Sequence, residues 1–310
     1  MINSQQDTLL LQLAQMSSEA RHPDSWDIDQ LSSLDIVKKI NAEDQTVAQS
    51  IVPCLSDVAL VADKIVNAFN NGGRLVYLGA GTSGRLGILD AVECPPTYSV
   101  PSSQVVALIA GGNGAVYKAV EGAEDNAQLA AEDLKNINFS ANDILVGIAA
   151  SGRTPYVLGG LAYARSIGAY TAAISCNAEA AVLSAADTGI CAVVGPEVVT
   201  GSTRMKAGTA QKLILNMLTT TAMIRCGKVY QNLMVDLHAS NEKLVARAVR
   251  IVMQATDCSA EVARKALQAA DMSAKLAILH VLTGNDIASC KQQLQQHGGS
   301  IRQTLQDTQP

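Results

Sequence analysis

The sequence predicts an α/β protein with a doubly wound, parallel, five-stranded sheet, followed by a small C-terminal helical domain. Short apolar runs alternate with helical patterns between residues 75 and 226, as they do when helices cover both faces of a parallel sheet. The runs are unbroken, which is typical of strands buried on both faces. Aromatic residues make up only 3% of the 310 residues, so small side chains must supply the packing between helices and sheet.

The first 40 residues are polar, and we expect an N-terminal arm or a loosely packed helix there. Apolar residues at helical spacing then predict a helix from 41 to 70, with Pro53 in a first turn or at a kink. Asn-Asn-Gly-Gly at 70–73 is expected to end this helix. The first strand is predicted at 75–78, followed by a glycine-rich loop and a short helix at 84–92.

Four more strands are predicted at 105–110, 144–149, 170–175 and 190–194. The helical patterns between and after them predict long helices at 115–134, 156–167 and 207–226. The sheet domain is therefore expected to span residues 41–238. Residues 239–310 show short helical segments with Ser or Asn at their starts, which predicts a small helical domain with no sign of chemistry.

Composition and patterning exclude several classes of function. The net charge of −5 and the lack of a basic stripe argue against a nucleic-acid partner. Neither a membrane span nor a signal peptide is predicted, so we expect a cytoplasmic protein without a membrane partner. The seven cysteines are scattered, as in proteins with reduced thiols, and the four histidines do not cluster, so no metal site is expected. His238 has no predicted role.

A glycine-rich loop, Gly79-Ala80-Gly81-Thr82-Ser83-Gly84, follows the first predicted strand and opens a helix. Its pattern matches the G-x-G-x-x-G of dinucleotide-binding domains. Those domains need a carboxylate at the end of the second strand to bind the ribose. Here the second strand ends in Ile-Ala-Gly-Gly-Asn at 109–113, so the dinucleotide interpretation is disfavoured.

A second loop, Ser151-Gly152-Arg153-Thr154, follows the third predicted strand, and both loops contain Ser-Gly-Arg. The carboxyl ends of the strands form the ligand crevice of a doubly wound sheet. Hydroxyls, loop amides and helix N-termini at that edge favour an anion, which predicts a phosphorylated ligand. The alternative is that both loops are ordinary strand-to-helix turns. The candidate phosphate contacts are Gly81, Thr82, Ser83, Ser151, Gly152, Arg153 and Thr154.

A third segment, GPEVVTGSTRMKAGT at 195–209, again lies between a strand and a helix and carries hydroxyls and cations. It adds Glu197, Ser202 and Lys206 to the candidate binding residues. Taken by itself, the segment is equally compatible with a capped helix start.

Together these features resemble the sugar isomerase (SIS) domain of phosphosugar enzymes, which implies a flavodoxin-like sheet. More narrowly, four segments look like the bacterial N-acetylmuramic acid 6-phosphate etherases: LGAGTSGRLGILDAVECPPTY, AVEGAED, GIAASGRTPYV and VGPEVVTGSTRMKAGTAQKL. The similarity runs from about residue 25 to about residue 290.

The resemblance implies cleavage of the ether between C3 of the sugar and its lactyl group, giving N-acetylglucosamine 6-phosphate and D-lactate. In the open-chain sugar the C1 aldehyde acidifies the C2 proton. A base then removes that proton, an acid protonates the departing ether oxygen, and water adds to C3. This chemistry needs no metal or redox cofactor. The resemblance also implies a homodimer and a place in cell-wall amino sugar recycling.

The proton donor of the family falls on Glu93, and its second catalytic acid/base falls on Glu124. From the residues alone, Glu93 precedes Cys-Pro-Pro and is expected in a rigid turn. Glu124 is one of several acids on a predicted helix, a pattern more typical of a solvated face. Glu197 matches a glutamate that serves the sugar end of the ligand in SIS isomerases. We expect it to assist ring opening or to bind a hydroxyl, with a carboxylate at a helix start as the alternative.

Two other functions fit the same resemblance. An aldose–ketose isomerase needs one base between C1 and C2 and no acid for C3. A non-enzymatic sugar-phosphate sensor fits less well, because the glucokinase regulatory protein carries two SIS units in roughly twice this length. SIS transcription regulators carry a basic DNA-binding domain, whereas the N-terminal arm here is not basic.

Overall fold

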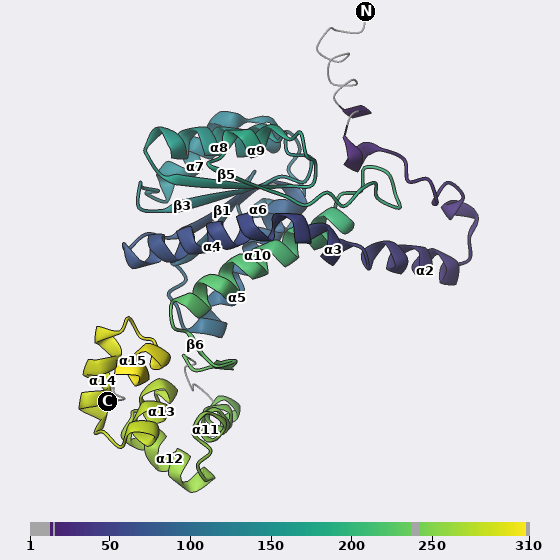
Figure 1. Ribbon diagram of the computed structural model, residues 1–310. Helices are drawn as coiled ribbons and strands as arrows, with labels where there is room; N and C mark the ends of the chain where they lie inside the picture. Colours follow the sequence, from purple (N-terminus) through teal and green to yellow (C-terminus); the bar gives the residue numbers. More distant parts are fainter. Residues whose placement is uncertain (1–12, 15, 237–241, 308–310) are drawn as a thin grey trace, which may run out of the picture. The chain divides into compact units, whose positions relative to one another are not determined.

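The computed structural model describes residues 13–14, 16–236 and 242–307 (Figure 1). The chain forms two compact units, which are Met1–Ala91 with Ser103–Thr219 and Val92–Ser102 with Thr220–Pro310. The domain boundary predicted at 238–239 lies outside the described residues, as does His238. None of the described helices combines the length and the apolar character that crossing a membrane requires.

The first unit contains the predicted parallel sheet. Its strands run in the order β2-β1-β3-β4-β5, and their bounds are Leu75–Gly79 (β1), Val105–Ile109 (β2), Ile144–Ile148 (β3), Tyr170–Ser175 (β4) and Thr188–Cys191 (β5). Every residue of β1 and β3 is buried, which explains their unbroken apolar runs. The chain reverses its direction of travel across the sheet between β1 and β3, so the doubly wound, flavodoxin-like fold class is confirmed. The last strand begins two residues earlier than the prediction.

Helices cover both faces of this sheet (Figure 1). One face carries α4 (Leu55–Asn70), and the other carries α7 (Ala127–Asn136), α8 (Pro155–Ser166) and α9 (Ala181–Ala185). Glycines allow α8 to pack closely on the sheet. A Cβ on Gly160 of α8 would collide with the side chain of Leu78 in β1, and a Cβ on Gly147 of β3 would collide with that of Val157 in α8. The packing by small side chains that the composition predicts is therefore present.

The N-terminal segment is helical but interrupted. After short 3-10 turns at Ser17–Glu19 and Ile28–Gln30 come α2 (Ser33–Asp44), α3 (Val47–Ile51) and the 3-10 turn η3 (Val52–Cys54). Pro53 sits in that last turn, directly before α4. Proline lacks the N–H that a continuous helix needs, so the predicted kink is confirmed.

The long helix predicted at 115–134 is wrong. The structure instead has α6 (Gly114–Tyr117), the 3-10 turn η4 (Ala123–Asp125) and α7, with Gly122 in the left-handed region at φ +75°. The guanidinium of Arg85 donates to the carbonyl oxygens of Ala115 and Val116 at 2.7 and 2.8 Å. A longer helix would need those oxygens as acceptors for amides four residues on, so this contact favours ending α6.

The helix after the first strand is longer than predicted. It spans Gly81–Tyr98 as α5 and contains Pro95 and Pro96 within its last turn. Glu93 therefore lies on a helix, and its predicted position in a rigid turn is wrong. The two prolines remove two amide donors from the end of the helix. The helix nevertheless continues past them, and the amide of Ser99 donates to the carbonyl oxygen of Pro95 at 2.9 Å.

The second unit is built from short helices around its own core. After the end of α10 (Lys206–Arg225) come two paired antiparallel strands, β6 (Val229–Tyr230) and β7 (Leu233–Met234), which the sequence did not predict. Five helices follow, α11 (Glu242–Thr256), α12 (Ala260–Ala269), α13 (Ala274–Thr283), α14 (Ile287–Gln296) and α15 (Ile301–Asp307). Ser259 and Ser273 cap α12 and α13 through backbone amides, as predicted, and Asp286 caps α14.

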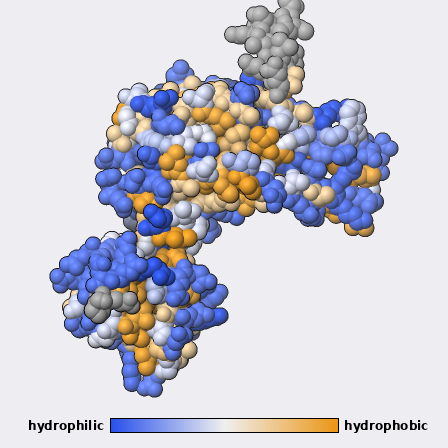
Figure 2. Space-filling model, in the orientation of Figure 1, coloured by the Kyte–Doolittle hydropathy of each residue, from blue (hydrophilic) through white to orange (hydrophobic). Residues whose placement is uncertain are grey.

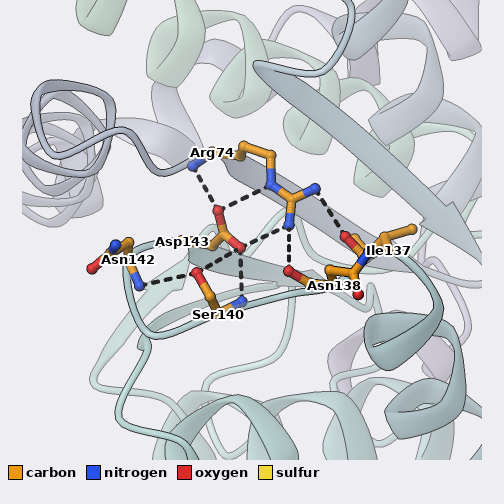
Figure 3. A network of polar contacts seen from close by, with 6 residues as sticks. All are labelled: Arg74, Ile137, Asn138, Ser140, Asn142 and Asp143. Carbon is orange, nitrogen blue, oxygen red and sulfur yellow. Dashed lines mark hydrogen bonds and ion pairs between the residues drawn. The ribbon is translucent and has the colours of Figure 1, made fainter.

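A buried ion pair joins the amino ends of β1 and β3 (Figure 3). One oxygen of Asp143 accepts from the amide and Nε of Arg74 at 2.8 and 3.1 Å, and the other accepts from Nη2 at 2.9 Å and from the amide of Ser140 at 2.8 Å. Burial favours the neutral carboxyl, but these donors outweigh it and lower the pKa of Asp143 below its ordinary value of 3.8. The pair fixes the edge of the sheet opposite to the glycine-rich loops.

Replacing Asp143 by asparagine is expected to lower the free energy of unfolding by about 2–3 kcal/mol at pH 7, because Arg74 keeps a partly buried charge without its counter-charge. Since the folded-state pKa is lowered, the stabilisation is present above the unfolded pKa and is lost as the pH falls through the folded pKa. Urea titrations should therefore show the gap between the two proteins closing below about pH 4. A constant gap would contradict this, and Asp29→Asn, at an exposed position, is the control.

Candidate functional site

Two cavities lie at the carboxyl edge of the sheet. The first, called the β1–β2 cavity, has a volume of about 250 Å³ and is lined by residues that follow these two strands, including Ala80, Gly81 and Ala110. The second, called the β3–β5 cavity, has a volume of about 340 Å³ and is lined by residues that follow the other three strands, including Ser151, Asn177 and Val193. The two Ser-Gly loops thus belong to different cavities.

A tight turn places the first loop. A Cβ on Gly84 would lie 2.6 Å from the side chain of Ile109 and 2.9 Å from the carbonyl oxygen of Gly79, so only glycine fits. Gly81 adopts φ +52° and lines the β1–β2 cavity. The turn therefore brings the start of α5 directly onto the ends of β1 and β2.

The structure brings Glu124 into the same cavity as this loop. Glu124 is exposed and lies in the 3-10 turn η4, not on a long helix. The segment before Glu124 contacts the turn after the second strand, where Val120 packs over Gly111. A Cβ built on Gly111 would lie only 2.9 Å from the Cβ of Val120, so the absence of a side chain at Gly111 permits this contact. Glu124, whose role was implied only by the resemblance, thus lies beside the glycine-rich loop.

Arg85 is a functional candidate that the sequence analysis missed. It lines the β1–β2 cavity, and its bonds to the carbonyls of Ala115 and Val116 hold the segment that leads to Glu124. The signal was present in the sequence, because Ser-Gly-Arg occurs in both loops. The sequence analysis named only the second of these arginines, Arg153, as a candidate binding residue.

The second loop lines the β3–β5 cavity with Ser151 and Arg153. Gly152 is buried at φ +72°, and a Cβ there would collide with the Cβ of Ala180. Thr154 is the N-cap residue of α8, and its side chain makes no capping bond. Arg153 makes no ion pair in the described part of the chain, and Glu179 lines the same cavity.

Asn177 connects this loop to the N-terminal arm and was also missed by the sequence analysis. Its Nδ2 donates to the carbonyl oxygen of Ala150 at 3.1 Å, while its Oδ1 accepts from the Ser17 hydroxyl at 3.1 Å and the Ser18 amide at 3.3 Å. The arm thereby forms one wall of the β3–β5 cavity. No local pattern marks an asparagine whose partners lie about 160 residues away.

Ser83 does not point freely toward a ligand. It is 8% exposed, and its hydroxyl donates to Oε1 of Gln211 on α10 at 3.0 Å. The buried Nε2 of Gln211 has no hydrogen-bond partner in the described part of the chain. Thr82 is partly buried near Gly208 at the start of α10. The predicted phosphate contacts of Ser83 and Thr82 remain predictions.

Glu197 caps α10. Its side chain is buried, and its two oxygens accept from the amides of Lys206 and Ala207, each at 3.0 Å. This geometry is that of the alternative interpretation, a carboxylate at a helix start, which the positive end of the helix dipole stabilises. A further role of Glu197 toward the sugar remains a prediction.

Lys206 is paired inside the protein. Its Nζ lies 2.6 Å from Oε2 of Glu43, and Nε2 of His22 lies 3.1 Å from the same oxygen. Burial favours the neutral carboxyl, but these two partners outweigh it and lower the pKa of Glu43. Ser202 is partly buried in the turn before α10. Neither Lys206 nor Ser202 lines the two cavities, and their predicted contacts with a ligand remain predictions.

Glu93 is exposed on α5 and belongs to the second unit, whereas Glu124 belongs to the first. It lines neither of the two cavities. Within the described residues, no group of three His, Cys, Asp or Glu side chains is arranged to hold a metal ion. All seven cysteines carry free thiols, and burial raises the pKa of Cys176 to about 12.

The Glu197→Gln variant is expected to lower the free energy of unfolding by about 1–2 kcal/mol, because an amide nitrogen replaces one of the two oxygens that accept from the start of α10. Urea denaturation followed by circular dichroism measures this change. The exposed Glu132→Gln variant is the matched control and should unfold like the parent. A Glu197→Gln protein as stable as the parent would show that the two capping bonds do not stabilise the fold.

Known proteins match the chain over nearly its whole length. Family models for the N-terminal SIS domain and the C-terminal lid domain of glucokinase regulatory protein match residues 57–165 and 231–277. The N-acetylmuramic acid 6-phosphate etherase of Actinobacillus succinogenes is 60% identical over 300 residues, covering 97% of this chain and 99% of that protein. The Vibrio campbellii protein of the same name is 58% identical over 304 residues, with 98% and 99% coverage.

Among solved structures, a phosphoheptose isomerase from Francisella tularensis is 18% identical and covers 63% of this chain and 100% of its own, with a TM-score of 0.47. The etherase relatives are far closer, since they share more than half of their residues with this chain over both full lengths. The chain therefore belongs to the N-acetylmuramic acid 6-phosphate etherase family.

Proposed function

We propose that this protein cleaves the D-lactyl ether of N-acetylmuramic acid 6-phosphate to N-acetylglucosamine 6-phosphate and D-lactate. Its full-length relatives carry the name of this activity. The observation that carries the proposal is the β1–β2 cavity, in which Glu124 lies beside the glycine-rich loop after β1. A carboxylate next to loop amides at a strand end can exchange protons with a bound sugar.

The reaction proceeds by elimination and water addition. The C1 aldehyde of the open-chain sugar acidifies the proton on C2, and one carboxylate removes it while a carboxylic acid protonates the departing ether oxygen. Water then adds to C3 of the unsaturated aldehyde, and C2 regains a proton. By the resemblance to the etherase family we assign this acid and base work to Glu124, which lines the β1–β2 cavity, and to Glu93, which does not. Each group is expected to contribute about 10²–10⁴-fold to the rate.

The 6-phosphate binds the second loop. Three features support this assignment: the guanidinium of Arg153, which makes no ion pair within the described residues, the hydroxyls of Ser151 and Thr154, and the amides at the start of the 12-residue helix α8. The N-terminus of such a helix favours an anion. The first loop is left out of this assignment, because Gly81 lines the β1–β2 cavity and the Ser83 hydroxyl donates to Gln211.

An isomerase of the same fold is the second candidate, and a sensor without turnover is the third. Only the shared SIS-type sheet favours the isomerase, whose reaction requires one base between C1 and C2 and no acid at C3. The sensor would bind the sugar phosphate and release nothing. Neither alternative releases D-lactate, so a measurement of D-lactate distinguishes both of them from the etherase.

We also infer a homodimer in the cytoplasm that acts on amino sugars from recycled cell wall. Val52, Leu55 and Leu60, on η3 and α4, are 55, 43 and 45% exposed, and apolar patches appear on the visible face of the first unit (Figure 2). Apolar groups gathered at a surface are typical of interfaces between subunits. Light scattering of the purified chain should give twice the mass of one subunit, and a monomer would contradict this inference.

The Glu124→Gln and Glu93→Gln variants are each expected to lose at least about 100-fold in D-lactate release, because glutamine cannot exchange a proton. The assay mixes each protein with N-acetylmuramic acid 6-phosphate and measures D-lactate with time. Glu132→Gln, another exposed glutamate one helix turn or more beyond Glu124, is the matched control and should act like the parent.

Three outcomes of this assay separate the candidates. Loss in both variants supports the shared acid/base roles. Loss in neither variant contradicts the assignment of the two glutamates, although the activity itself stands. No release by the parent protein, with the sugar phosphate bound unchanged, contradicts the etherase and favours the sensor.

A further inference from the structure

The β1–β2 cavity contains one cation and two carboxylates. Arg85 is the cationic residue among its lining side chains, and Glu121 and Glu124 are the acidic ones. An anionic group that enters this cavity is repelled by the two glutamates when they are ionised. It therefore needs a favourable partner, and Arg85 is the side chain in this cavity that can supply one.

Arg85 is fixed in position but not neutralised. Its Nε and Nη2 donate to the carbonyl oxygens of Val116 and Ala115 at 2.8 and 2.7 Å. These acceptors carry no net charge, and Arg85 makes no ion pair within the described residues. A guanidinium has five N–H donors, so donors remain for a ligand. The two bonds hold the group rigid, which reduces the entropy lost when a ligand binds.

The proposed substrate carries two anions. One is the phosphate on C6, and the other is the carboxylate of the lactyl group attached through oxygen to C3. The eliminated bonds are at C2 and C3, so a catalytic carboxylate must lie near those atoms. Glu124 lies in the β1–β2 cavity, and the lactyl group on C3 then lies in the same cavity.

We propose that Arg85 binds the carboxylate of the lactyl group and selects substrates that carry this acid; the proposal rests on the etherase function above. The other arginine of the repeated Ser-Gly-Arg, Arg153, lies in the β3–β5 cavity with the phosphate loop. Each of the two anions of the substrate then has its own cavity and its own arginine. A sugar phosphate without an acidic substituent on C3 cannot form this ion pair with Arg85 and binds less well.

The test compares two substrates, N-acetylmuramic acid 6-phosphate and the analogue whose lactyl carboxylate is converted to a neutral primary amide. Both carry the same ether and the same phosphate. The parent protein is expected to prefer the acid by at least about 30-fold in kcat/KM, since a charge-assisted contact to a fixed guanidinium is lost with the amide. Arg85→Gln should lose most of that preference: the loss of its bonds to the Ala115 and Val116 carbonyls slows both substrates by the same factor, and the lost contact with the carboxylate slows the acid further.

A purely structural role of Arg85 gives a different result. If Arg85 acted only by holding the segment that leads to Glu124, Arg85→Gln would slow both substrates by the same factor and leave the preference unchanged. That outcome overturns the proposal. Failure of the parent protein to release D-lactate from the acid would instead contradict the etherase function, so the two failures are distinguishable.

Two controls complete the comparison. Arg153→Gln is expected to lower kcat/KM by the same factor for both substrates, because both carry the phosphate. Arg165→Gln, on the exposed end of α8, should leave both unchanged. If Arg85→Gln does not fold, as judged by circular dichroism, Arg85→Lys gives the same comparison. A lysine lacks the planar fork, so the preference for the acid should fall by at least about 5-fold, and an unchanged preference overturns the proposal.

Discussion

The tight turn between β1 and α5 is the constraint on which the β1–β2 cavity depends. Because Gly84 lies against Ile109 and the carbonyl of Gly79, α5 begins directly at the ends of two strands. Arg85, the next residue, then reaches the carbonyls of α6. Its two bonds favour an end to that short helix, after which the chain turns at Gly122 and places Glu124 at the cavity. A side chain at Gly84 would displace all of these groups together.

A second set of contacts fixes the opposite side of the carboxyl edge. Glu197 holds the first amides of α10, and Lys206 on that helix pairs with Glu43 of the N-terminal segment. The arm also reaches the loop after β3 through Asn177. Residues that the sequence presents as ligand contacts, Glu197 and Lys206, thus have internal partners. The cations without such a partner, Arg85 and Arg153, are the ones that line the cavities.

The fold was largely predictable because its signals are local. Strands buried on both faces must be continuously apolar, glycine marks the turns, and Pro53 marks a break, so a parallel sheet covered on both faces follows from the pattern. Its flavodoxin-like type was implied only by the resemblance to SIS domains. The errors arise where distant residues decide the outcome. Arg85 acts on α6 from about 30 residues away, and Ser83 bonds to Gln211 at a separation of 128 residues. The β6–β7 pair has two residues in each strand, too few to show any periodicity.

We propose that the ether is broken on the sugar side, by elimination across C2 and C3 followed by addition of water to C3. The direct test is to run the reaction in water enriched in oxygen-18 and to analyse both products by mass spectrometry. Cleavage on the sugar side predicts one oxygen-18 atom at C3 of N-acetylglucosamine 6-phosphate and none at the hydroxyl of D-lactate. Oxygen-18 in the lactate hydroxyl, with none at C3 of the sugar, would show displacement on the lactyl side and would contradict the elimination.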